Sequence, residues 1–218
     1  MSVICRYCDV SALSDADLFL RGMKALPWQT RRESIMRLRF DKDRRLSLGA
    51  GLLAAYALRQ AGAECFDLWQ TENHKPFLTA HPGIHFNLSH SGKLAVCAVS
   101  DQPVGVDVEE LRQSPAGVAQ HCFQPRELAW MNASRDRDLA FFRLWTRKES
   151  FLKLSGIGLG RSMNSFSVLP GENMEDGAVF TEWEKEEHLI CVCSAGQQTA
   201  TLRKCPVSLL IPEDTTAL

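Results

Sequence analysis

Two neighbouring carboxylates in the middle of the chain have the spacing of a cation site. Residues 104–109 read VGVDVE and alternate strictly between apolar and other residue types. Side chains on a β-strand repeat every two residues, so the valines predict a core-facing side, and Asp107 and Glu109 share the opposite side. Two adjacent carboxylates repel each other. The pair is therefore either a solvated strand face or part of a site for a hard cation.

A third carboxylate lies on the strongest predicted helix, residues 138–155. Spacings of three and four place Glu149 on one face with large apolar side chains, namely Phe142, Trp145 and Leu152. An unpaired charge on such a face is costly. An i,i+4 bridge to Lys153 is one compensation. The other is a site shared with the strand pair, because three carboxylates with open positions suit Mg²⁺ and substrate phosphates.

Two further segments carry groups that could bind anions. Residues 86–92 (FNLSHSG) predict a turn between two strands, where His90 is either an ordinary turn residue or, with Ser89, part of a phosphate cradle. Positions 31–45 form either a solvated helix face or a local phosphate pocket. The seven basic residues there are Arg31, Arg32, Arg37, Arg39, Lys42, Arg44 and Arg45. Lys75-Pro76 adds a cation on a rigid turn.

The elements that must position these groups alternate without a regular βαβ rhythm, which predicts an α+β fold. Helices are expected over about 14–23, 27–40, 43–60, 125–131 and 138–155. Strands are expected over about 1–10, 66–71, 84–88, 94–100, 104–109, 165–169, 178–183, 189–194 and 207–211.

Composition excludes several classes of protein. The chain has 218 residues, 45% of them hydrophobic, and a net charge of −1, which gives no reason to expect a nucleic-acid partner. No apolar run reaches membrane-spanning length. The first residues lack the pattern of a secretory signal, so we expect a cytoplasmic protein. The eight cysteines lie mostly in apolar runs and are expected to be buried thiols.

Four segments together resemble the Sfp-type 4′-phosphopantetheinyl transferases. They are Lys75-Pro76, residues 86–92, Gly105 to Glu109, and Trp145 to Lys153 (WTRKESFLK). Their order and spacing match the family from near Arg31 to about residue 168. The combination of the GxDxE strand with the WxxKExxxK helix is far more specific than either motif alone.

The resemblance implies a fold, a reaction and partners. The family fold is an α+β monomer, a pseudo-dimer of two similar halves with the active site at their junction. Here it implies an N-terminal half, residues 1–103, facing the phosphates and adenine of coenzyme A. The C-terminal half, residues 104–218, would carry the metal-binding carboxylates and face the carrier protein. The implied activity moves phosphopantetheine from coenzyme A to a serine of an apo acyl- or peptidyl-carrier protein.

The resemblance also implies residue roles. Asp107, Glu109 and Glu149 match the Mg²⁺ ligands, Glu149 would also help to deprotonate the serine, and Lys153 would neutralise charge on the pyrophosphate. The residues implied to contact coenzyme A are Arg45 at the 3′-phosphate, Ser89, His90 and Lys148 at phosphates, and Lys75 with Pro76 at adenine and ribose.

Some matters stay open at this point. His74 replaces a glycine of the family pattern, Glu33 stands where a cation is frequent, and the role of Glu127 is undecided. Two rival functions use the same residues: a metal-dependent phosphohydrolase acting on nucleotides or coenzyme A, and a binding module without turnover.

Overall fold

The computed structural model describes residues 2–73, 75–156, 160–172, 174, 177–196 and 199–212, so His74 lies outside the described residues. The strands are β1 (Val3–Asp9), β2 (Leu68–Gln70), β3 (Pro76–Leu78), β4 (His85–Ser91), β5 (Leu94–Ser100), β6 (Val104–Glu110), β7 (Val179–Lys185), β8 (His188–Ser194) and β9 (Ala200–Lys204). The helices are α1 (Ala16–Ala25), α2 (Gln29–Arg37), α3 (Asp41–Gln60), α4 (Val118–Cys122), α5 (Pro125–Ala133), α6 (Arg137–Ser155) and α7 (Val207–Leu210). Short 3₁₀ turns are η1 (Ser11–Ser14) and η3 (Met163–Ser165).

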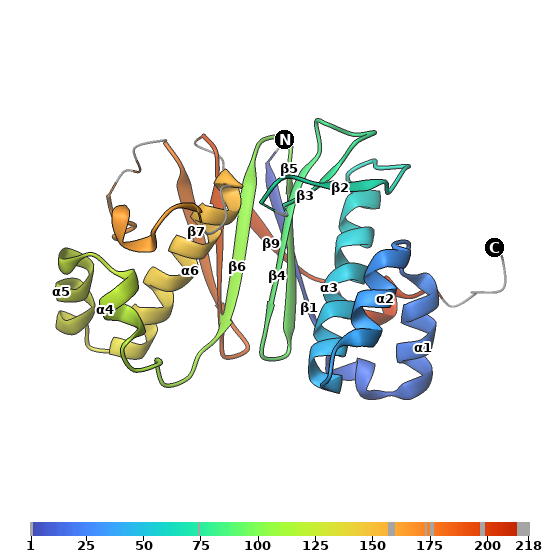
Figure 1. Cartoon of the computed structure of the whole chain (residues 1–218), viewed down its shortest axis with the longest axis horizontal. Coiled ribbons are helices and arrows are strands. Elements are labelled where there is room, and N and C mark those ends of the chain that lie inside the picture. Colours follow the sequence, from blue (N-terminus) through green and yellow to red (C-terminus); the bar gives the residue numbers. More distant parts are fainter. Residues whose placement is uncertain are drawn as a thin grey trace.

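Two sheets pack against each other between two long helices. Helix α3 covers the outer face of the β4-β5-β1-β9 sheet, and α6 covers that of the β6-β8-β7 sheet (Figure 1). The valines of the 104–109 alternation lie at 0–1% exposure in the apolar layer between the sheets. The predicted division of this strand into a core face and a carboxylate face is therefore confirmed.

The two halves repeat one topology. The first half runs from β1 through helices to the antiparallel hairpin β4–β5, in the sheet order β4-β5-β1. The second runs from β6 through helices to the hairpin β7–β8, in the order β7-β8-β6. In each half the longest helix precedes the hairpin and packs on its sheet. The expected α+β fold of two similar halves is confirmed.

The end of the described chain returns to the first half. Strand β9 pairs in parallel with β1, and α7 packs on α3. Residues 207–211 were expected to form a strand, but Val207–Leu210 form this helix. Its buried Val207 and Leu210 join the apolar cluster around α3. A short apolar run has no periodicity that separates helix from strand. The division between residues 103 and 104 stays a prediction.

Gly105 lets α6 approach β6 closely. A Cβ added there would lie 2.0 Å from Ser150 O and 2.5 Å from Leu154 N, both backbone atoms of α6. We expect Gly105→Ala to lower the free energy of unfolding by between about 1 and 3 kcal/mol, because the helix must move away. Urea unfolding measures this. Gly83→Ala is the control, since its Cβ meets nothing within 4 Å. Equal stability of both variants would show that the helix is not so close.

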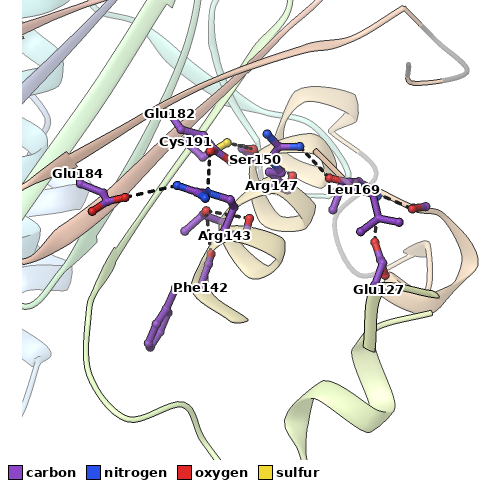
Figure 2. Close-up of polar contacts among 12 residues, drawn as sticks. Glu127, Phe142, Arg143, Arg147, Ser150, Leu169, Glu182, Glu184 and Cys191 are labelled. Atoms are coloured by element: carbon purple, nitrogen blue, oxygen red, sulfur yellow. Dashed lines mark hydrogen bonds and ion pairs between the residues drawn. The ribbon is translucent and has the colours of Figure 1, made fainter. Parts of the chain in front are cut away.

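Ion pairs fix α6 against β7. Arg143 Nε lies 2.9 Å from Glu182 Oε2, its Nη2 lies 3.3 Å from Glu184 Oε1, and Arg147 pairs with Glu182 (Figure 2). Arg147 also donates to the carbonyl of Val168 at 2.9 Å. These contacts hold the helix that carries Glu149 in one orientation on the sheet.

Side chains replace a predicted strand after α6. Residues 165–169 were expected to be a strand, but η3 ends at Ser165 and no ladder follows. Lys148 Nζ donates to the carbonyls of Met163 and Phe166, each at 2.7 Å, and Glu127 Oε1 accepts from Val168 N at 2.9 Å. These three backbone groups are thus satisfied by side chains rather than by a neighbouring strand.

All eight cysteines are free thiols within the described residues, most of them buried, as expected. Among the helices that the structure describes, none is long and apolar enough to cross a membrane.

Candidate active site

A row of polar side chains on β4 joins the two halves. Residues 86–92 were expected to be a turn, but residues 85–91 form β4 because their backbone pairs in full register with β5. Alternate side chains of β4 point toward β6. The hydrogen bonds join Asn87 Oδ1 to Val106 N (2.9 Å), Ser89 Oγ to Asp107 Oδ1 (2.8 Å) and Ser91 Oγ to Glu109 Oε2 (2.9 Å). The strand thereby positions both carboxylates of β6.

Asp107 lies at the centre of this arrangement and is 3% exposed. Its Oδ1 accepts hydrogen bonds from Ser89 Oγ and from Lys153 Nζ, the latter at 2.6 Å. Its Oδ2 is buried and has no hydrogen-bond partner among the described residues. A buried carboxylate oxygen without a partner is unfavourable, so this atom is suited to a ligand.

Three carboxylates influence one another here. Burial raises the pKa of Glu109, and the charge of Asp107 raises it further, against hydrogen bonds from Ser91 and Trp145. Burial also raises the pKa of Glu149, and the charges of Asp107 and, to a smaller extent, Glu109 raise it further. The charge of Lys153 lowers it. Strand β6 and helix α6 therefore place their acids close enough to repel each other, which a bound cation would relieve.

Lys153 pairs with Asp107 rather than with Glu149. Its Nζ also donates to Ser89 Oγ at 3.1 Å, and the described residues contain no Glu149–Lys153 ion pair. The i,i+4 bridge considered from the sequence is therefore not the compensation that forms. One ammonium from α6 instead reaches the acidic strand and the polar row of β4.

These residues fit a hard divalent cation with open positions. The donors are carboxylate oxygens, which Mg²⁺ prefers, and Asp107 Oδ2 is free to bind one. Within the described ranges, no group of three or more acidic, histidine or cysteine side chains is already arranged to hold a metal ion. Such a site would need ligands from a substrate, as Mg²⁺ sites commonly do.

A cleft of about 970 Å³ opens beside the carboxylates, between the two halves. Glu149 and Lys153 line it from α6, Arg31 and Ser47 from α2 and α3, and Trp69 from β2. Its volume is at the upper end of the ~300–1,000 Å³ range of small-molecule sites. The first half thus lines the cleft with an arginine and hydroxyls, and the second half lines it with Glu149 and Lys153.

Several residues that the sequence predicted as contacts of coenzyme A or its phosphates line the cleft. Lys75 and Pro76 line it, and Arg31 donates to Ser47 O at 2.9 Å and 3.2 Å. Arg45 is half-buried on α3 and is not part of the cleft lining.

Ser89 and His90 are consecutive residues of a strand, so they point to opposite faces of β4. Ser89 faces Asp107, whereas the charges of Arg31 and Lys153 reach His90. His90 is exposed overall, but partial desolvation of its ring lowers its pKa. The charges of Arg31 and Lys153 lower the pKa further.

Lys148 requires a correction, because it does not reach the cleft. Both Lys148 and Glu127 are 0% exposed, and Lys148 Nζ lies 2.9 Å from Glu127 Oε2. With the two carbonyls of the 163–166 segment, this acid engages all three donors of the ammonium. Lys148 has no donor left for a phosphate, so the predicted phosphate contact is wrong.

Sequence reasoning missed three residues of this region. Asn87 and Ser91 were treated as turn residues, although their alternation with Ser89 signals a strand face. Trp145 was assigned only to the core, yet its side chain is close enough to Glu109 to lower the pKa of that carboxyl. Glu127, whose role the sequence left undecided, caps α5 by accepting from Gln124 N at 2.8 Å.

Comparison with known proteins decides the family. Residues 103–207 match the model of the 4′-phosphopantetheinyl transferase superfamily, and residues 15–102 match that of the 4′-phosphopantetheinyl transferase N-terminal region. The chain is 35% identical over 154 residues to a 4′-phosphopantetheinyl transferase of Bacillus subtilis, covering 65% of this chain and 67% of that protein. The chain belongs to the 4′-phosphopantetheinyl transferase family.

Other relatives cover similar portions of this transferase. A 4′-phosphopantetheinyl transferase of Bacillus pumilus is 36% identical over 149 residues, which span 66% of this chain and 64% of that protein. The matches thus span about two thirds of these curated relatives. A solved holo-[acyl-carrier-protein] synthase of Thermotoga maritima is 19% identical with a TM-score of 0.38, covering 43% of this chain and 62% of that one.

Proposed function

We propose that this transferase moves the 4′-phosphopantetheine arm of coenzyme A to a serine hydroxyl of an apo acyl- or peptidyl-carrier protein, with Mg²⁺. The serine oxygen forms a bond to the phosphorus that carries the pantetheine arm. The bond from that phosphorus to the bridging pyrophosphate oxygen breaks, and adenosine 3′,5′-bisphosphate leaves. The hydroxyl proton passes to a base.

One observation carries this proposal. Asp107 Oδ2, buried and without a hydrogen-bond partner in the described part of the chain, lies beside two carboxylates whose pKa values are raised, and one of these, Glu149, lines the large cleft. Asp107, Glu109 and Glu149 would hold the metal. Bound there, Mg²⁺ would supply neutralisation of pyrophosphate charge.

The remaining residues suit positioning and charge neutralisation, which is most of what phosphoryl-type transfer asks of a protein. Glu149 lines the cleft and has a raised pKa, as befits a base for the serine proton, directly or through water. The ammonium of Lys153, already held at Asp107, lies where it would offset charge on the leaving pyrophosphate. Arg31, which lines the cleft, and His90, whose pKa the charge of Arg31 lowers, would serve the phosphates.

Intact mass of an apo carrier protein tests the proposal. With Mg²⁺ and coenzyme A we expect the carrier to gain one phosphopantetheine group, and none when a chelator is present. A panel of acyl- and peptidyl-carrier domains should be used, because the sequence does not predict which pathway supplies the carrier. No mass gain on any of them would contradict the proposal.

Two further measurements separate the rival functions. Release of 4′-phosphopantetheine from coenzyme A without any carrier would indicate a phosphohydrolase. Tight binding of coenzyme A without turnover, insensitive to chelator, would indicate a binding module. The cytoplasmic location, the monomeric state and the absence of nucleic-acid and membrane partners stay predictions.

A further inference from the structure

The Lys75 side chain spans the junction between the halves. Its Nζ donates to three backbone carbonyls of the second half. The acceptors are Lys153 O at 2.6 Å, Leu154 O at 3.0 Å and Val104 O at 3.2 Å. An ammonium has three donors, and each has an acceptor here. Lys75 lines the cleft with its stem, but its charge is used for contacts within the protein.

Two of these acceptors, Lys153 O and Leu154 O, are carbonyls that the end of a helix leaves without partners, and the third, Val104 O, belongs to β6. The last four carbonyls of a helix lack intrahelical donors, and a cation at this end is favoured by the helix dipole. Helix α6 ends at Ser155, and Gly156 closes it in the left-handed region at φ 66°. Lys75 therefore caps the turn of α6 that carries Lys153.

The backbone of Lys75 is also fixed by hydrogen bonds. Lys75 N donates to Thr71 Oγ1 at 3.1 Å, and Thr71 N donates to Lys75 O at 3.0 Å, closing the turn between β2 and β3. The Lys75 side chain, which bridges this turn and the end of α6, is therefore held at both of its ends. Displacement of the turn would move the end of α6, and with it Lys153 and Glu149.

We propose that Lys75 is a positioning residue of the transfer reaction, whose ammonium fixes the last turns of α6, with Glu149 and Lys153, against the first half. This role rests on the function proposed above. It replaces the expectation that the Lys75 side chain borders the adenine and ribose of coenzyme A. Lys75 acts on the reaction only through α6.

The surroundings of Lys75 make this contact sensitive to alkali. Burial lowers the pKa of Lys75 to about 8, and the Cys193 thiol on β8 opposes this shift. Among the described residues, His85 of β4 also feels the charge of Lys75, Glu149 and Lys153 of α6 line the same cleft, and no carboxylate forms an ion pair with the ammonium. A neutral amine has two N–H donors, so deprotonation leaves one of the three carbonyls without a partner.

The lowered pKa of Lys75 affects global stability in the opposite direction from its effect on the α6 contact as pH rises. The folded pKa is below the unfolded value of 10.5, so the unfolded chain binds more protons between about pH 8 and 10.5. The contribution of Lys75 to stability therefore rises with pH across this window, while the geometry of α6 loosens. A fall in activity above pH 8 without loss of stability would separate positioning from unfolding.

Steady-state transfer to an apo carrier from pH 6.5 to 9.5 tests this role. At pH 7 we expect Lys75→Met to lower kcat by about 10- to 100-fold, since small misplacements of reacting groups are costly. The KM for coenzyme A should change by less than about threefold. Lys75→Arg should recover most of kcat and lose the alkaline fall of the wild type, because its guanidinium does not titrate. Lys24→Met on α1 is the control for loss of a surface lysine.

Hydrogen exchange of the 150–155 amides at pH 7 keeps this result separate from the proposed function. We expect faster exchange there in Lys75→Met and wild-type protection in Lys75→Arg, whether or not transfer is detected. A raised KM with unchanged kcat would mean that Lys75 binds coenzyme A directly and would overturn the role. An identical alkaline fall in the arginine variant, or equal exchange in all three proteins, would also overturn it.

Discussion

Asp107→Asn is expected to abolish phosphopantetheine transfer while the protein stays folded. Asparagine keeps an oxygen that accepts from Ser89 but removes the charge that binds Mg²⁺ and Lys153. The loss in kcat should be at least about 10²-fold, the scale of losing one electrostatic stabiliser of a transition state. Glu149→Gln should lose a similar factor. Transfer is measured by carrier mass over time, and folding by thermal unfolding.

Glu110→Gln is the matched control for this pair. Glu110 is an acid on the same strand, but it lies at an even position and points to the opposite face from Asp107 and Glu109. We expect its transfer rate to stay within about threefold of the wild type, as for positions that make no contact with the reacting groups. Near-normal transfer by Asp107→Asn or Glu149→Gln would refute the assignment of metal ligands.

Lys148→Met is expected to cause the largest loss of stability, about 3–5 kcal/mol in the free energy of unfolding. It leaves Glu127 charged and buried, and it removes the donors to the carbonyls of Met163 and Phe166. Burial lowers the pKa of Lys148, and Glu127 opposes that shift, so the pair depends on both partners. Urea unfolding of the single variant measures the loss.

Two further variants show whether the buried pair is the cause. The double variant Glu127→Gln with Lys148→Met should regain part of the loss, because no unpaired charge remains buried. Arg126→Ala breaks an exposed pair with Glu172 and should change stability by no more than about 1 kcal/mol. Equal effects of Lys148→Met and Arg126→Ala would contradict a buried ion pair.

The sequence predicted the elements with strong periodicity and the residues within them. The 138–155 helix and the 104–109 strand were both expected, because each has a regular apolar face. Their acids came together at the junction, although Asp107 and Glu149 lie far apart in the chain. Lys153 was expected at the site, and the structure places it on Asp107.

Tertiary contacts decided what the sequence could not. Lys148 is adjacent to Glu149 and resembled a phosphate ligand, but only the fold brings Glu127 and two carbonyls to its ammonium. Polar composition argued for a turn at residues 86–92, yet the β5 ladder made it a strand whose serines orient the acids. The carbonyl acceptors of Lys75 depend on where α6 ends in space, and no local pattern encodes that.

Metal binding tests the central claim most directly, namely that acids from β6 and α6 hold one divalent ion. Mn²⁺, which shares the oxygen ligands of Mg²⁺, can be followed by electron paramagnetic resonance in the presence of coenzyme A. We predict one bound Mn²⁺ per wild-type chain, displaced by Mg²⁺, retained in Glu110→Gln and lost in Asp107→Asn and Glu149→Gln. Undiminished Mn²⁺ binding by those last two variants would contradict the account.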